Sequence, residues 1–374
     1  MTKKVLLATR PLVPPWDEAS KNFAYFLGRE VRDHKLTLLT TREKLAGLPA
    51  TVTEEPIFNG SHLTFGAKVA LFRYLCSVRG NFDITHYLFT PTKQNSTFIK
   101  LLARPSRGKT LQTIATLRED LYTPEELRSL LFADHLTVYT DLTKKKLENL
   151  GLDNVTRIYP GIDLDLYRPG AKDPAVLTSY QLQAADFLVI YPGEYTRLGA
   201  TDMLFTAFSD YFQKNPNSNI KFLFACRIKN DADRTKREEL QAKVKQLDLE
   251  RHILFQAEHA TTNMAALYNT ADVVLFPVEN LRGKFDVPLI IIEAYACGKP
   301  VILSDLPQFA EFTNHDICVT IPKDSGTKLI ESVANLSQNK AECERLGANA
   351  RRFVQEHFDL KNTAQQYEEL YASL

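Results

Sequence analysis

The sequence predicts an α/β protein made of two successive arrays in which short strands alternate with helices. Short apolar runs rich in β-branched residues recur between helical stretches, as expected for buried parallel strands. One stretch, 271–305, shows the unit most clearly: a strand at 273–276, a polar loop, a helix at 289–297 and a strand from 301. Such a βαβ unit has parallel strands joined by a right-handed crossover. The two arrays, of about 170 to 190 residues each, therefore predict two Rossmann-like domains.

The first array begins with the apolar run VLLAT, and Gly151 closes its last predicted helix. Prolines at 11, 14 and 15 are expected to end the first strand and open a loop. The first helix is amphipathic, because Phe23, Phe26 and Leu27 fall on one face. The predicted strands are 4–9, 36–40, 83–89, 111–116 and 135–139, and the predicted helices are 20–31, 66–78, 95–103, 125–131 and 142–150.

The second array is organised around 271–305, where Pro288 suits the start of the helix, Gly298 its C-terminal cap, and Pro300 prevents its continuation. The other predicted strands are 187–191, the KFLFAC run from 221, and 253–255, and the other helices are 236–247, 264–268, 327–336 and 340–355. We expect the domains to span 1–170 and 171–355, with 356–374 as a separate C-terminal helix.

Composition is ordinary for a globular protein: 374 residues, 44% hydrophobic, 24% charged, net charge +1. The whole chain does not indicate nucleic-acid binding. Residues 1–170 carry 24 Lys and Arg against 18 Asp and Glu, a net +6, and the remainder carries −5. A basic first half could meet an acidic acceptor or an anionic membrane face; an evenly solvated surface is the alternative. No apolar run approaches the roughly 20 residues of a membrane span.

The five cysteines are scattered, and none forms a C-x-x-C pair that would support a zinc or redox site. This pattern favours a reducing cytosol, so we expect a cytoplasmic protein. The sequence implies no cofactor and no metal. The short D-x-D at 163–165 is too unspecific to predict a metal site.

One residue of the predicted helix 289–297 stands out. Glu293 is surrounded by leucine, isoleucine, alanine and tyrosine, which is the composition of a buried helix. An ionised carboxylate in such a place needs a partner. Two interpretations stay open: a structural ion pair or hydrogen bond inside the domain, or a carboxylate held to accept hydrogen bonds from the hydroxyls of a ligand.

The run IIIEAYACGKPVI resembles the signature of retaining glycosyltransferases of family 4. In that family this glutamate, here Glu293, binds the ribose of a nucleotide-sugar donor. A second glutamate eight residues earlier contacts the donor sugar; that position is Phe285, with Asp286 beside it. The loop also resembles a divergent branch that reads Gly-Lys-Phe-Asp-x-Pro, which includes Lys284.

Further stretches carry the same resemblance. The run YPGID before YRP, at 159–169, is similar to the family's interdomain crossover, and DITH at 83–86 to a strand near which an active-site histidine lies, here His86. In the first loop the family has paired glycines, whereas this chain has Ala-Ser at 19–20. The resemblance implies a GT-B fold: two Rossmann-like domains with parallel sheets facing across a cleft, and a C-terminal helix that returns to the N-terminal domain.

The family's phosphate clamp is altered in this chain. Glu194 stands where the family has an arginine, and Leu198 where it has a lysine. The donor pyrophosphate still requires cations and N–H donors. The candidates for this role are Arg197, Arg227, Arg282 and Lys284, and Glu311, in a stretch similar to the family's Pro-x-x-Glu loop, is a further donor-loop candidate.

The resemblance implies a metal-independent transferase that moves a hexosyl group from a nucleotide diphosphate sugar, with retention, to a glycan, lipid or small-molecule acceptor. The candidate residues, by role, are His86 and Asp286 for catalysis, Glu293 with the cations above for the donor, and Trp16, Ser20 and Lys21 on the acceptor side. An inactive nucleotide-sugar-binding partner and a nucleotide-sugar epimerase are the alternatives. No G-x-G-x-x-G follows the first strand, which disfavours a dehydrogenase.

Overall fold

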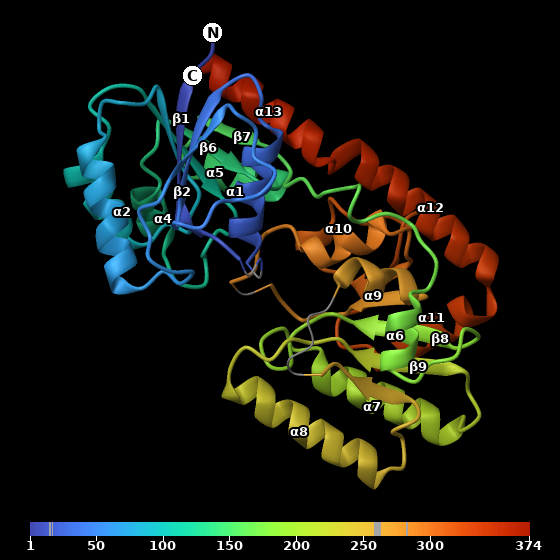
Figure 1. Ribbon diagram of the computed structural model, residues 1–374. Coiled ribbons are helices and arrows are strands. Elements are labelled where there is room, and N and C mark those ends of the chain that lie inside the picture. Colours follow the sequence, from blue (N-terminus) through green and yellow to red (C-terminus); the bar gives the residue numbers. More distant parts are fainter. Residues whose placement is uncertain (15, 17, 258–262, 282) are drawn as a thin grey trace. The chain divides into compact units, whose positions relative to one another are not determined.

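The computed structural model describes residues 1–14, 16, 18–257, 263–281 and 283–374 (Figure 1). The chain forms two compact units, which are described separately. Unit 1 contains Met1–Asp163, Gly283–Val287 and His357–Leu374, and unit 2 contains Leu164–Arg282 and Pro288–Glu356. The first boundary lies at 163 rather than at the expected 170. The assignment of Gly283–Val287 to unit 1 was not expected from the sequence.

Unit 1 is a seven-stranded parallel sheet in the order β3-β2-β1-β4-β5-β6-β7. The order reverses between β1 and β4, where the loops at the carboxyl ends of the strands diverge. The strands are β1 Lys4–Leu12, β2 Lys35–Thr40, β3 Val52–Glu55, β4 Ile84–Tyr87, β5 Lys109–Ile114, β6 His135–Val138 and β7 Val155–Arg157. The helices are α1 Ala19–Glu30, α2 Phe65–Ser77, α3 Lys93–Phe98 with the π-helix η1 Ile99–Ala103, α4 Pro124–Leu130, α5 Asp141–Asn149 and α13 Leu360–Ser373.

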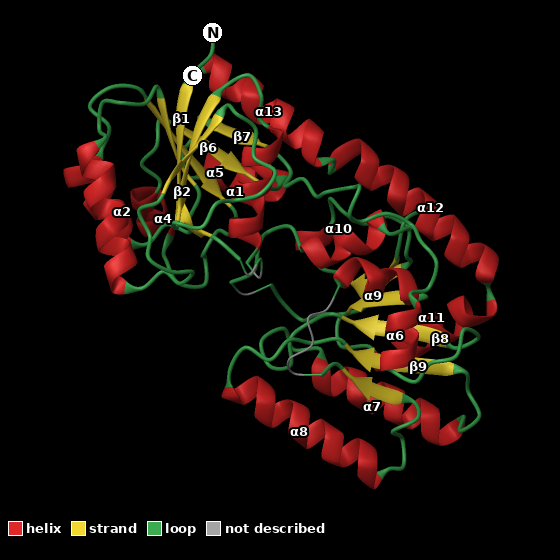
Figure 2. Cartoon of the chain, viewed as in Figure 1, coloured by secondary structure: helices red, strands yellow, loops and turns green. Residues whose placement is uncertain are grey.

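Both faces of this sheet are buried, which is why its strands are nearly continuous apolar runs. Alternate side chains of β1 enter different cores. Val5 and Leu7 pack with residues of α1 and α13, whereas Leu6 and Ala8 pack with residues of α2 and η1. Figure 2 shows the helices of each unit flanking its strands.

The C-terminal helix α13 packs into the first of these cores through Tyr367 and Tyr371. Gly161 permits the approach, since a Cβ at this position would lie 2.4 Å from the Cα of Leu360. The packing carries a buried polar network: His86 Nδ1 hydrogen-bonds the Tyr371 hydroxyl at 2.8 Å, and Nε2 hydrogen-bonds Thr113 Oγ1 at 2.6 Å. Burial lowers the pKa of His86 to about 3, so the ring is neutral.

Tyr371→Phe should destabilise unit 1, because it leaves a buried ring nitrogen of His86 without its partner. An unmade buried hydrogen bond costs about 1–3 kcal/mol. The midpoint of urea unfolding at neutral pH should fall accordingly. Tyr211→Phe is the control, since the Tyr211 hydroxyl is only partly buried, 3.3 Å from Ser218 Oγ. Equal midpoints for the two variants would contradict the role given to the network.

Unit 2 is a six-stranded parallel sheet in the order β10-β9-β8-β11-β12-β13, so its switch point lies between β8 and β11. In such sheets ligands bind at the carboxyl ends of the strands beside the switch point. The strands are β8 Phe187–Tyr191, β9 Ile220–Phe224, β10 Ile253–Phe255, β11 Val273–Phe276, β12 Val301–Ser304 and β13 Val319–Ile321. The helices are α6 Pro174–Ser179, α7 Thr201–Lys214, α8 Asp231–Gln246, α9 Met264–Thr270, α10 Leu289–Ala296, the 3-10 turn η2 Pro307–Phe309, α11 Gly326–Gln338 and α12 Lys340–His357.

Several expected elements differ from the structure. β1 continues past Pro11 to Leu12, with an irregular register between Leu7 and Leu12 on β2, which lets the strand pass the proline. The stretch 95–103, expected to be one helix, is α3 followed by the π-helix η1. The short elements β3, α6, η2 and β13 were not predicted. All of these differences lie in stretches where hydrophobic periodicity is short or interrupted.

Candidate functional site

Helix α10 follows the switch-point strand β11 and is held at both ends. Gly298 takes a φ of +68° just after it, a left-handed conformation that suits glycine. The Arg351 guanidinium donates to the carbonyl of Ala296 at 2.9 Å, placing a cation at the helix C-terminus. A Cβ on Gly347 of α12 would lie 2.0 Å from the Gly298 carbonyl oxygen. The lack of a side chain at Gly347 therefore allows α12 to pack closely against the end of α10.

Glu293 lies on the less buried face of α10. The positions of α10 that retain some exposure are Leu289, Ile290 and Glu293, which share one face, whereas Ile291, Ile292 and Ala294 to Ala296 are buried. The Tyr268 hydroxyl donates to Glu293 Oε2 at 3.0 Å, and the Tyr167 hydroxyl makes a second side-chain hydrogen bond. The carboxyl group is thus held by residues of α9 and of the segment before α6, all within unit 2.

Burial dominates the electrostatic setting of Glu293. Desolvation raises its pKa to about 7, although the hydroxyls of Tyr268 and Tyr167 and the charge of Arg227 act in the opposite direction. A carboxylate has about four acceptor positions, and the two tyrosine hydroxyls occupy about half of them. The group therefore keeps acceptor capacity for hydroxyl donors of a ligand, as the second interpretation of the sequence requires.

Glu293→Gln should stabilise unit 2 at alkaline pH. The folded pKa of about 7 lies above the usual glutamate value of 4.5, so the carboxyl group favours folding below pH 4.5 and loses that contribution as pH rises through 7. Glutamine does not ionise, so the variant does not lose stability in this way, and its amide oxygen can still accept the hydrogen bond from Tyr268. At pH 8 its free energy of unfolding should exceed that of the wild type by about 1–3 kcal/mol, and the difference should shrink at pH 5. Urea titrations at both pH values test this; a glutamine variant that is less stable at pH 8 would contradict it.

A cluster of charges, the Glu194 cluster, lies after β8 and β9. It consists of Glu194, Arg197 and Lys229. The Glu194 side chain is 6% exposed and accepts from Arg197 Nε at 2.6 Å and Nη2 at 2.9 Å, and from Lys229 Nζ at 2.8 Å. Arg197 and Lys229 are 41% and 43% exposed, so the acid is buried beneath two cations that reach solvent.

The loop that carries this cluster is fixed by its neighbours. Gly199 has a φ of +80°, and a Cβ there would lie 2.3 Å from the carboxyl carbon of Glu279, on the loop after β11. The backbone N–H of Glu279 donates to the Leu198 carbonyl at 2.9 Å. The loops after β8 and β11 therefore pack against each other at the switch point, where ligands are expected. Helix α7 begins directly after this loop without a side-chain cap.

The segment Gly283–Val287, in the loop expected to contact the donor sugar, is part of unit 1. Asp286 accepts from Thr143 Oγ1 at 2.7 Å and from the Leu117 N–H at 3.4 Å, and its own N–H donates to the Ala115 carbonyl. Desolvation raises the Asp286 pKa to about 7, against hydrogen bonds from Thr143 and Leu117. The Phe285 ring lies 5.7 Å from that of Tyr139. These contacts make Asp286 an anchor of the segment, and its catalytic role stays a prediction.

Lys284 lies in the same segment, where its carbonyl accepts from Thr116 Oγ1 at 2.9 Å. His86 is fully buried behind α13 with both ring nitrogens bonded to side chains, and its catalytic role also stays a prediction. On the acceptor side, Trp16 stacks on Tyr25 with ring centroids 4.4 Å apart. Ser20 and Lys21 lie in the first turn of α1, where Lys21 is buried.

Three of the remaining predicted donor residues lie in the described part of unit 2. Arg227, exposed just after β9, is near enough for its charge to lower the pKa of Glu293. Arg197 is in the Glu194 cluster. Glu311 is half-buried after η2. Arg282 lies outside the described residues. Within the described ranges, no group of three or more His, Cys, Asp or Glu side chains is arranged to hold a metal ion.

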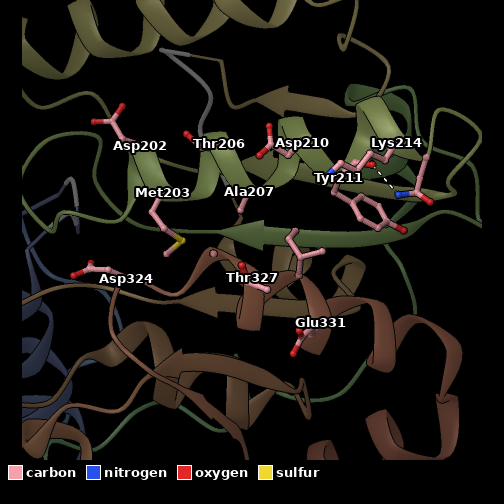
Figure 3. Close-up of a pocket in the computed structure, with 13 residues that line it drawn as sticks. Asp202, Met203, Thr206, Ala207, Asp210, Tyr211, Lys214, Asp324, Thr327 and Glu331 are labelled. Atoms are coloured by element: carbon pink, nitrogen blue, oxygen red, sulfur yellow. Dashed lines mark hydrogen bonds between the residues drawn. The ribbon is translucent and has the colours of Figure 1, made fainter.

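A separate groove of about 630 Å³ runs between α7 and α11 (Figure 3). Figure 3 shows Asp202, Met203 and Asp210 on α7 opposite Thr327 and Glu331 on α11. None of the residues predicted from the sequence lines it. The groove is therefore distinct from the Glu293 site and from the Glu194 cluster.

Sequence reasoning missed Lys229, Tyr167 and Tyr268. The signal for Lys229 was present, since it follows Arg227 by two residues just after β9, the neighbour of the switch-point strand β8. Tyr268 and Tyr167 gave no comparable signal, because 25 and 126 residues separate them from Glu293 and only the fold brings them together. Glu194 was noted as the replacement of an arginine, but its role as the shared partner of two cations was not foreseen.

Part of the chain is similar to known glycosyltransferases. Residues 178–353 match the family described as glycosyl transferases group 1. The chain is similar to the D-inositol 3-phosphate glycosyltransferase of Rhodococcus erythropolis, at 29% identity over 177 residues, 46% of this chain and 39% of that protein. The enzyme of the same name from Corynebacterium glutamicum is 24% identical over 267 residues, 67% of this chain and 60% of that one. The match thus spans about two fifths to three fifths of the length of these relatives.

Among solved structures, sucrose-phosphate synthase from Thermosynechococcus elongatus superimposes with a TM-score of 0.77 at 16% identity, covering 99% of this chain and 98% of that one. Anabaena HepE, in complex with UDP and glucose, superimposes with a TM-score of 0.72 at 16% identity, covering both chains fully. At this identity the likeness shows the fold alone. The expected fold class is confirmed: the chain has the GT-B fold of two Rossmann-like units, and the greater part of its second unit matches the group 1 glycosyltransferases.

Proposed function

We propose that this protein is a glycosyltransferase that uses a nucleoside diphosphate sugar as donor and binds the donor on unit 2. The observation that carries the proposal is Glu293, a carboxyl group held by two tyrosine hydroxyls on the more exposed face of a buried helix. This group lies on the helix that follows β11, beside the switch point of the sheet. A cis-diol such as that of ribose would supply the two hydroxyl donors that the carboxylate can still accept.

We propose UDP as the nucleotide of the donor and a hexose as its sugar. The support is that structures of Anabaena HepE with UDP and with UDP-glucose share this fold, and that the group 1 match covers most of unit 2. The proposed acceptor is a glycan, a lipid or a small molecule bound on unit 1. With a lipid acceptor, the basic first half would contact the membrane that holds the lipid.

The Glu194 cluster is the proposed diphosphate clamp. Arg197 and Lys229 carry two positive charges to the surface above one buried negative charge, which leaves a net +1 for the leaving diphosphate. The bidentate contact with Glu194 fixes the Arg197 guanidinium. The side chain therefore loses less conformational entropy when the ligand binds. The clamp thereby replaces the arginine and lysine that the family places at Glu194 and Leu198.

The proposed reaction retains the anomeric configuration and needs no metal. Its transition state has oxocarbenium character, as in glycoside hydrolysis. Charge stabilisation on the leaving diphosphate is then the main demand on the protein. Epimerisation instead requires a cleft histidine or carboxyl pair. His86, on which that alternative depended, is buried with both nitrogens bonded.

Incubation with UDP-sugars and candidate acceptors tests the proposed activity. We expect transfer or slow donor hydrolysis, unchanged by EDTA, with a product whose anomeric configuration, read by NMR, matches that of the donor. UDP should raise the melting temperature, because it binds the native state only. Glu293→Gln should weaken UDP binding by about tenfold. Binding that is undiminished in this variant would contradict the site; UDP binding without any turnover would favour the inactive-partner alternative, which the altered Phe285 position also suggests.

Arg197→Ala and Lys229→Ala should each weaken UDP binding by about tenfold and uridine binding by less than about twofold, because the clamp acts on the diphosphate alone. Isothermal titration with UDP and uridine gives the two affinities. The matched control is Lys236→Ala, which removes a cation of α8 that pairs with Asp202. If uridine and UDP lost affinity equally, these cations would not be the clamp.

A further inference from the structure

A stripe of exposed apolar side chains runs over α2 and η1. Phe65 is 81% exposed, Val69 40%, Leu101 74% and Leu102 55%. Phe65 and Val69 share a face of α2 with Phe72 and Cys76, as their spacing of three and four residues requires. The stripe is defined as Phe65, Val69, Phe72, Cys76, Leu101 and Leu102.

One contact joins α2 to α3 and a second joins α2 to η1. The Phe72 and Phe98 rings lie 4.1 Å apart, and Cys76 Sγ lies 3.6 Å from the Leu102 carbonyl oxygen. The apolar face of α2 therefore continues onto η1. Figure 1 shows α2, in light blue, at the outer edge of unit 1. Burial of such large side chains would be favourable, yet unit 1 leaves them in water.

The same stretch is strongly basic. Residues 56–109 carry eight Lys and Arg and one acid, Asp83. All nine of these charged residues are exposed. Acids of other elements pair with two of the cations: Glu126 with Lys93, and Asp134 with Arg104 at 3.8 Å. The other cations make no ion pair with any described residue, and they are Lys68, Arg73, Arg79, Lys100, Arg107 and Lys109.

We propose that the stripe and its surrounding cations dock unit 1 onto an anionic lipid bilayer. Phe65 and Leu101 would enter the boundary between headgroups and acyl chains while the cations meet the anionic headgroups. A second copy of the chain fits less well, because two surfaces of the same sign repel. A polyanion such as nucleic acid would use the cations but would leave the aliphatic side chains exposed. Within the described part of the chain, no helix is long and apolar enough to span a bilayer.

Sedimentation with vesicles tests the proposal on the full-length protein. Wild type should sediment with vesicles of phosphatidylcholine and phosphatidylglycerol at low salt, and at least about tenfold less with phosphatidylcholine alone. Raising the salt concentration should weaken binding, because the Debye length falls. Phe65→Ser with Leu101→Ser, and separately Lys68→Glu with Arg73→Glu, should each reduce binding by about tenfold. These residues are exposed, so the substitutions should leave the melting temperature unchanged.

Leu121→Ser and Lys340→Glu are the matched controls, since Leu121 is 56% exposed and the Lys340 side chain 90% exposed, both outside the stripe. Both should bind vesicles as the wild type does. The proposal is overturned if the wild type does not bind anionic vesicles, binds both vesicle types equally, or keeps its binding in the two double variants. Gel filtration showing a dimer that Phe65→Ser dissolves would also overturn it. UDP-induced stabilisation, measured without vesicles, tests the proposed function separately.

Discussion

The hydrogen bonds from Tyr268 and Tyr167 to Glu293 are the interaction on which the proposed function depends. Desolvation penalises the ionised carboxyl group, and two neutral hydroxyls offset that penalty only in part, so its pKa stays near 7. An arginine bonded to Glu293 would have lowered the pKa and used the acceptor positions of both oxygens. The ionised Glu293 carboxyl group therefore destabilises the fold of the ligand-free protein. Such uncompensated groups are characteristic of functional sites.

The strand order of the sheet in unit 2 determines where the proposed donor-binding residues lie. In unit 2 the loops after β8 and β11 pack against each other at the switch point, and the C-terminal end of β9 brings Arg227 and Lys229 to the same edge. The proposed clamp differs from that of the family at two positions, 194 and 198. An acid at 194 would repel a diphosphate by itself, but buried beneath Arg197 and Lys229 it holds two cations in place. The altered family motif is thus compatible with diphosphate binding.

The sequence predicted the elements whose signals are local. The strand at 273–276 was predicted as observed and the helix from 289 to within one residue, because β-branched runs, Pro288, Gly298 and Pro300 mark their ends. Glu293 was found because an acid among isoleucines violates the pattern of a buried helix. The sequence did not indicate that Gly283–Val287 would join unit 1, because its bonds to Ala115, Leu117 and Thr143 are non-local. The continuation of β1 through Pro11 likewise depends on an irregular register in the tertiary structure.

The central claim is that the Glu293 carboxylate accepts hydrogen bonds from the ribose hydroxyls of the donor nucleotide. The most direct measurement compares the affinities of UDP and 2′,3′-dideoxyuridine diphosphate for the wild type and for Glu293→Gln. The account predicts that loss of the two hydroxyls weakens binding to the wild type by about tenfold or more, and that the ratio falls towards one in the variant. Equal affinity of the wild type for both nucleotides would contradict it.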